Sequence, residues 1–264
     1  MRLLLPAFAL ALALLLPDPS RAGAWTLPPG DGLAIFTLTH SRADRFFDGA
    51  GGLTSGADFA KTEASLYLEY GLAEGLTLLA QSTLAAKQVD GPVPDERAGL
   101  DYSELGLRLR LGRWNDYVFS AQASGRAPGA SAPASPAEIG STDPEVDLRL
   151  LAGRGFALGA SSGYVDLQLA YRLRLDDPPN EIRLDATFGW RPRPRWLALA
   201  QVFGTFADGS ASGVFTDARF AKLQLSAAYE LTERWTVQAG AFATPWGRDA
   251  AQENGVFASV WTAF

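Results

Sequence analysis

Residues 255–264 read GVFASVWTAF and end the chain on an aromatic carboxy-terminus. Every second residue of this stretch belongs to one uncharged and largely apolar row, made of Val256, Ala258, Val260, Thr262 and Phe264. Because successive side chains of a β-strand point to opposite faces, the row predicts a strand with one face turned toward an apolar environment. The other row mixes small, polar and aromatic residues, so the terminal Phe is the stronger indication of the kind of strand.

A last strand with an apolar face and a terminal Phe resembles the closing strand of Gram-negative outer-membrane β-barrels, by which such chains are recognised for assembly. The resemblance rests on residues 255–264 and extends to the rest of the chain through its repeated hairpin pattern. It implies an all-β fold, a transmembrane antiparallel up-and-down β-barrel in the cell outer membrane. It also implies that Phe264 is the assembly signal, and that outer-membrane lipids, the barrel-assembly machinery and periplasmic chaperones are partners.

The amino-terminal end has the layout of a secretory signal peptide. Arg2 precedes an apolar run from Leu3 to Leu16, and small residues that suit a cleavage site follow at positions 22–24. The run is shorter than the ~20 residues that a membrane-spanning helix needs, so we expect cleavage and not anchoring. The sequence therefore predicts a cleaved signal peptide over residues 1–24 and a single outer-membrane barrel domain over residues 25–264.

Composition narrows the class further. With 27 Gly and 16 Pro, the chain is punctuated by turns and long helices are not expected. It has no Cys, so an exported chain must be stable without disulfides. The net charge of −6 argues against a nucleic-acid partner, and a single His without Cys argues against a zinc site. No metal or cofactor is expected.

Alternation of apolar and charged residues predicts the strands. It is clearest over residues 102–112, where four leucines at 105, 107, 109 and 111 alternate with Glu104, Arg108 and Arg110. The expected strands are residues 32–42, 61–70, 76–88, 102–112, 117–126, 145–152, 164–175, 181–190, 195–206, 220–231, 235–245 and 254–264. The count is about 12, with roughly 10 to 14 left open because residues 153–163 are irregular.

Connection lengths predict how the barrel is oriented. Short connections near residues 71, 113, 192 and 232 alternate with long ones near 50, 95, 135, 212 and 249, as periplasmic turns alternate with outer loops. Aromatic residues flank the short turns, as expected of a girdle at the periplasmic interface: Tyr70, Trp114, Trp190, Trp196, Tyr229 and Trp235. An even strand number places both termini on the periplasmic side. A soluble β-sandwich also alternates and turns often, and is the alternative fold.

If the apolar rows face lipid, the polar rows line the lumen. One row supplies a neutral belt of glutamines at Gln81, Gln122, Gln168, Gln201 and Gln238. The other candidate lining residues are charged: Glu104, Arg108, Arg110, Glu145, Asp147, Arg149, Arg172, Arg174, Arg183 and Asp185, with Glu63, Glu69, Lys222 and Glu230 on related rows. The arginines either pair with Glu104 or neighbouring carboxylates and plug the lumen, or line a constriction that selects solutes.

These features favour a passive channel or uptake pore for a small polar or amphiphilic solute whose identity the sequence does not give. Length, leader and hairpin style are also similar to those of the uncharacterised channel-like barrels linked to aromatic-compound degradation. A non-conducting barrel with a structural, adhesive or assembly role, working through its long acidic loops, is the second hypothesis.

An outer-membrane lipid-modifying enzyme is the third hypothesis. Outer-membrane phospholipases, which resemble this chain in strand number, set a His and a Ser two apart on one strand face. Here His40 is followed directly by Ser41, and alternation places the two side chains on opposite faces. No catalytic residue is therefore assigned.

Overall fold

The computed structural model describes residues 23–91, 94–129, 143–175, 178–209 and 216–264. Strands are the only regular elements in these ranges. They are β1 (Gly32–Phe47), β2 (Leu53–Ala73), β3 (Leu76–Asp90), β4 (Asp95–Trp114), β5 (Tyr117–Pro128), β6 (Glu145–Leu158), β7 (Ser161–Arg174), β8 (Asn180–Arg193), β9 (Trp196–Asp208), β10 (Arg219–Glu230), β11 (Trp235–Arg248), β12 (Ala250–Ala251) and β13 (Asn254–Ala263). No helix among the described residues is long and apolar enough to cross a membrane.

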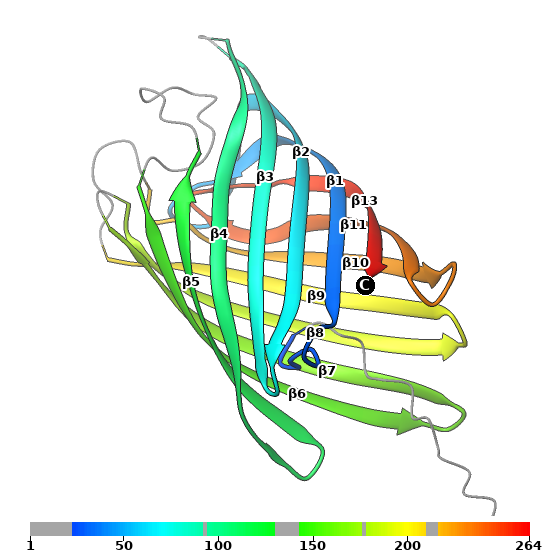
Figure 1. The fold of residues 1–264 in the computed structure, drawn as a ribbon. Helices are drawn as coiled ribbons and strands as arrows, with labels where there is room; N and C mark the ends of the chain where they lie inside the picture. Colours follow the sequence, from blue (N-terminus) through cyan, green and yellow to red (C-terminus); the bar gives the residue numbers. More distant parts are fainter. Residues whose placement is uncertain (1–22, 92–93, 130–142, 176–177, 210–215) are drawn as a thin grey trace, which may run out of the picture.

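The sheet closes on itself. Each long strand pairs antiparallel with the next, and β1 pairs with both β2 and β13, so that twelve long strands form a barrel (Figure 1). Backbone hydrogen bonds of 2.6 and 3.0 Å join Gly32 and Phe264 in both directions and complete the seam. The predicted up-and-down barrel of about 12 strands is confirmed. The two-residue β12 is an addition that pairs with the outer end of β1.

Two predicted long loops are wrong. Most of the described residues in the ranges 43–60 and 89–100 are strand: β1 runs on to Phe47, β2 begins at Leu53, β3 ends at Asp90 and β4 begins at Asp95. In these outer parts polar residues occupy both rows, as Thr54 and Ser55 do in β2 and Asp95 and Glu96 in β4, so the apolar–polar alternation of the sequence disappears although the backbone pairing continues. β2 has 21 residues, far more than the ~9–11 that cross a bilayer.

Short turns close one end of the barrel, which the sequence predicts to be the periplasmic end. Residues 153–163, irregular in sequence, form a tight hairpin in which β6 ends at Leu158 and β7 begins at Ser161. Gly159 takes a φ of +60° in this turn, and Asn115 takes +52° between β4 and β5, as two-residue hairpins require. The strand count is therefore unaffected by this segment.

The outer face is apolar, as the leucine row predicted. Leu105, Leu107, Leu109 and Leu111 are between 45% and 62% exposed, whereas Arg108 between them is 4% exposed. Trp114, Trp190, Trp196 and Trp235 are also well exposed, and the rings of Trp196 and Tyr229 lie 4.9 Å apart beside the periplasmic turns. Side chains of this kind meet lipid and its headgroup boundary.

The lipid face can be tested on β10. Leu225 is 66% exposed and lies four residues above Tyr229 of the girdle, whereas Leu231, 50% exposed, lies in the turn below it. We expect Leu225→Arg to destabilise the barrel by about 2–4 kcal/mol and the control Leu231→Arg by about 0–1 kcal/mol, because the penalty for Arg falls with distance from the bilayer midplane. Denaturant unfolding in lipid vesicles measures both. Equal losses would mean that this face does not meet lipid as argued.

Candidate functional site

The lumen contains a cavity of about 490 Å³. Its lining comes from the inward rows of strands around the barrel, and its two sides differ in chemistry. Arg149, Asp166 and Asp185 contribute charge on the side of β6, β7 and β8. The side from β9 to β13 is neutral: it carries glutamines together with Phe203, Phe242 and Phe257.

The neutral side is a hydrogen-bonded ladder. Gln224 donates to Gln201 at 3.0 Å, and Gln201 donates to the Thr187 hydroxyl at 3.2 Å. Gln238 donates to the Ser226 hydroxyl at 2.8 Å. An amide can both donate and accept, so this wall can exchange hydrogen bonds with a passing solute without changing charge.

Four of the five glutamines expected in a belt border the cavity: Gln81, Gln168, Gln201 and Gln238. Gln122 instead accepts two hydrogen bonds of 3.2 Å from Arg108. Gln224, which sequence reasoning did not single out, completes the ladder. Gln224 lies two residues after Lys222 on the same row of β10, and this spacing could have identified it as a lumen residue from the sequence.

The charged side is an ion-pair network. Arg149 bonds to Asp185 and to Asp147, and Arg172 pairs with Asp147 at 3.0 Å. Arg174 lies 3.0 Å from Glu145. The other pairs that the structure records here are Arg126 with Glu104 and Glu145, Arg172 with Glu145 and Glu181, Arg174 with Glu181, and Arg183 with Glu181. Arg126 and Glu181 were not predicted, since both lie at the outer ends of their strands.

Arg108 is bound in the wall and not free in the lumen. Its guanidinium donates to Glu69 at 2.9 Å, and the two side chains are 5% and 1% exposed. Glu69 lies two strands away, on β2; in the intervening β3, Thr77 pairs with Arg108 and Leu79 pairs with Glu69. The carboxylate partner is thus Glu69, while Glu104 pairs with Arg126.

Arg110 shares the face of Arg108 but has a different environment. It bonds to Glu74 in the β2–β3 turn at the periplasmic mouth. The hydrogen bond and the positive charge of Arg110 hold the pKa of Glu74 below its usual range. The two arginines therefore play separate roles, one inside the wall and one at the rim.

The segment before β1 enters the periplasmic end of the barrel (Figure 1). The backbone N–H of Leu27 donates to the Thr77 hydroxyl at 2.8 Å, and Arg108 donates to the carbonyl of Trp25 at 3.2 Å. The Trp25 ring meets Tyr164 edge-on, with centroids 5.7 Å apart. No sequence pattern predicted this placement, because a short irregular segment carries no periodicity.

At the opposite mouth, Glu253 joins three strands. Lys222 lies 2.8 Å and Lys61 3.6 Å from its carboxylate, and Ser41 donates to it at 2.5 Å. Burial disfavours the ionised form, but the two lysines overcome that penalty and hold the pKa of Glu253 at about 2. The cluster is therefore ionised at neutral pH and ties β1 and β2 to β10.

His40 and Ser41, the pair considered for lipid hydrolysis, lie on opposite faces of β1, as alternation predicted. His40 is exposed on the outer face, with Nδ1 3.0 Å from the Thr62 hydroxyl. Ser41 is 1% exposed on the inner face. The two side chains therefore cannot act on the same substrate group.

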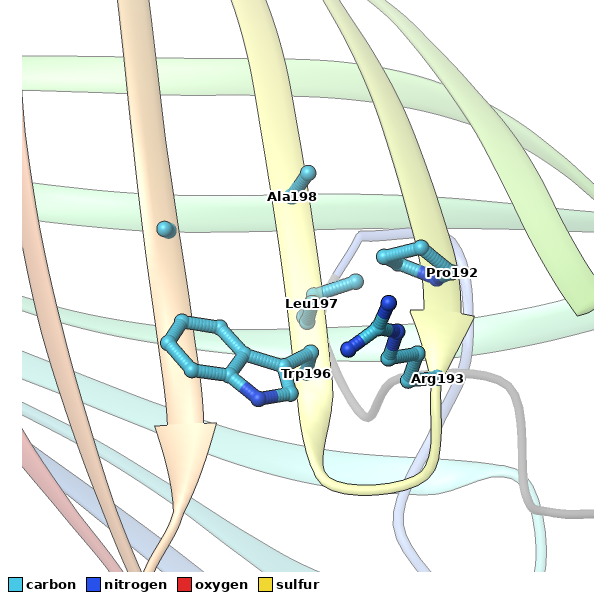
Figure 2. A pocket seen from close by; sticks show the side chains of 6 residues that line it. Pro192, Arg193, Trp196, Leu197 and Ala198 are labelled. Atoms are coloured by element: carbon cyan, nitrogen blue, oxygen red, sulfur yellow. The ribbon is translucent and has the colours of Figure 1, made fainter.

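A second hollow, of about 290 Å³, lies at the β8–β9 turn. Figure 2 shows Arg193 and Trp196 beside it, with Pro192, Leu197 and Ala198. It is mostly apolar and adjoins the aromatic girdle, whereas the lumen cavity combines polar and apolar groups. The lumen is therefore the candidate functional site.

Breaking the buried pair tests how the lumen wall is stabilised. We expect Arg108→Met to lower the free energy of unfolding by about 3–5 kcal/mol, because it leaves the Glu69 carboxylate buried and unpaired. Arg154→Met, which breaks an exposed 3.5 Å pair with Asp116, is the control and should cost about 0–1 kcal/mol. Adding Glu69→Met to Arg108→Met should recover stability. Similar losses for the two single variants would contradict a buried, essential pair.

Comparison with known proteins supports the fold. No protein-family model matches the sequence, and no curated protein matches it significantly. Among solved structures, the COG4313 outer membrane channel from Pseudomonas putida F1 superposes with a TM-score of 0.76 at 18% identity, over 94% of this chain and 99% of that one. The KdgM porin gives 0.54 at 8% identity, over 87% and 99% of the chains. The translocator domain of the autotransporter NalP from Neisseria meningitidis gives 0.54 at 12%, over 90% of each. The chain thus has the fold of the outer-membrane β-barrels.

Proposed function

We propose that this barrel is a passive outer-membrane channel for small polar or amphiphilic solutes. The chain enters the outer membrane after it has been exported and its leader has been removed. The observation that carries the proposal is the lumen cavity of about 490 Å³, which sets three Phe rings beside a ladder of glutamines. A volume of this size suits a small organic molecule. The names of two structural neighbours, an outer membrane channel and a porin, support the same class.

The wall chemistry points to a solute with an apolar ring or chain and a neutral polar group. Phe203, Phe242 and Phe257 offer apolar contact, and Gln201 and Gln238 offer donors and acceptors. The arginines on the other side already bind carboxylates of the protein. A free ion would have to compete with these partners, so we infer that charged solutes pass less readily than neutral ones.

Conductance in a planar bilayer tests the proposal. We expect the purified barrel to conduct, and Arg149→Glu to shift the reversal potential toward cation selectivity, because Arg149 borders the cavity and the change alters its local charge by two units. The shift should be larger at ~0.01 M salt, where the Debye length is about 30 Å. Arg154→Glu, at the exposed base of β6, is the control. Absence of conductance would favour the non-conducting structural or adhesive barrel, which the paired charges and the inserted amino-terminal segment would suit.

The proposed assembly signal has its own test. Phe264 is 61% exposed, and its ring covers Gly32, where an added Cβ would lie 2.2 Å from the ring. We expect deletion of Phe264 to reduce outer-membrane insertion several-fold while export and leader removal continue, because the deletion removes the proposed signal for the assembly machinery together with the two Gly32–Phe264 hydrogen bonds that complete the seam. Phe264→Tyr keeps an aromatic end and is the control. Heat-modifiable mobility on a detergent gel reports insertion, and normal insertion of the truncated chain would contradict this role.

A further inference from the structure

Asp166 of β7 is a buried carboxylate with neutral partners. It is 2% exposed, one oxygen accepts the backbone N–H of Ala24 at 2.6 Å, and the other accepts the side-chain amide of Gln168 at 2.6 Å. Within the described part of the chain, no Lys or Arg lies within 4 Å of it in a salt bridge. A buried carboxylate is stabilised best by a cation bonded to it, and Arg108 and Arg149 act on Asp166 only from beyond that distance, so the carboxylate has no direct cationic partner.

The residue that lies against this carboxylate is Gly23. A Cβ at position 23 would lie 2.3 Å from an Asp166 oxygen, and Gly23 has a φ of +88°. The main chain at Gly23 therefore lies directly against the carboxylate. The backbone nitrogen of Gly23 precedes the Ala24 amide that already bonds to Asp166, so position 23 is where a cation on the main chain would meet the carboxylate.

Ala24 is held as tightly as a core residue. It is fully buried, its N–H donates to Asp166, and its carbonyl accepts from the buried Ser120 hydroxyl at 2.5 Å. Cleavage after Ala24, the site expected from sequence, would remove this residue and leave Ser120 and Asp166 without these partners. Cleavage after Ala22 would retain both bonds, and it too follows the small-residue pattern, with Ser20 and Ala22 before the cut.

We propose that the leader is removed between Ala22 and Gly23 and that the new α-ammonium group of Gly23 binds Asp166 inside the lumen. Hydrolysis adds one water: the leader keeps the carboxylate of Ala22, and Gly23 gains the amine. An α-amino group with an ordinary pKa of about 7.7–8.0 is largely protonated at pH 7. The ion pair fixes the chain end, and Ser120, Arg108 and Thr77 hold the residues that follow. This inference rests on the leader removal proposed above and is independent of conduction.

The cleavage site is read directly from the mature protein. The full-length chain, exported with its own leader and purified from the outer membrane, is analysed by intact mass spectrometry and amino-terminal sequencing. We expect it to begin at Gly23. A chain beginning at Trp25, or one that retains the leader, would overturn the proposal, and neither result bears on whether the barrel conducts.

Reactivity of the terminal amine tests the ion pair. We expect an amine-reactive ester at neutral pH to label Gly23 at least ten-fold more slowly in the folded barrel than in the denatured chain, scored on the terminal peptide. Asp166→Asn should remove most of this protection, and Glu233→Gln, in the exposed β10–β11 turn, should leave it unchanged.

A second variant tests the ion pair if Asp166→Asn does not fold. Gly23→Ala changes no residue of the barrel wall and places a methyl group against the carboxylate, so it should also expose the amine. Heat-modifiable mobility confirms that each variant is folded before labelling. If the wild-type amine in the folded barrel reacts as fast as in the denatured chain, the ion pair is absent even where the chain begins at Gly23.

Discussion

Closure of the sheet between β1 and β13 is the constraint on which the molecule depends. Inside a bilayer no water is present to satisfy backbone N–H and C=O groups, so a strand-built protein must pair every strand on both edges. Ten consecutive residue pairs, from Leu33 with Ala263 to Arg42 with Asn254, achieve this at the seam. Once the sheet is closed, one face meets lipid and the other faces the lumen. Because side chains alternate along each strand, the position of a residue decides which of these two surroundings its side chain meets. The apolar rows around Leu107 and Leu225 and the polar rows around Arg108 and Gln224 follow from that division.

A closed barrel also confines charge. An inward-facing arginine in a narrow lumen cannot reach bulk water freely, and an unpaired charge in such a place is costly. Two features of the lumen wall avoid the cost of an unpaired charge. On β4 to β8 every arginine expected to line the lumen has a carboxylate partner, and Arg108 reaches across β3 to Glu69 on β2. On β9 to β13 near the cavity the same problem is avoided, because Gln201, Gln224 and Gln238 bond to one another or to hydroxyls.

Sequence alone predicted what alternation encodes. The twelve strands, the outward leucines and the opposite faces of His40 and Ser41 all depend on the period of two, which is local and visible in the chain. The outer ends of β2 and β4 were missed because polar residues on both rows remove the apolar–polar alternation while the backbone ladder continues. The pairing of Arg108 with Glu69 was left open because an arginine can reach past its neighbouring strand. The insertion of residues 23–30 was missed because each of its contacts, such as that of Ala24 with Asp166, joins positions far apart in the chain.

The two chemistries of the lumen wall have different consequences for a solute in the proposed channel. To bind a guanidinium of the ionic side, an anion must first displace a carboxylate such as Asp185 that the protein holds in place, and that exchange gains little. To bind the glutamine side, a neutral polar group replaces one hydrogen bond with another of similar strength, while an apolar ring of the same molecule can contact Phe203, Phe242 or Phe257. Binding that is favourable but weak lets a solute both enter and leave. The paired charges therefore shape the lumen and hold its walls, and in the proposed channel the neutral wall is the surface that selects the solute.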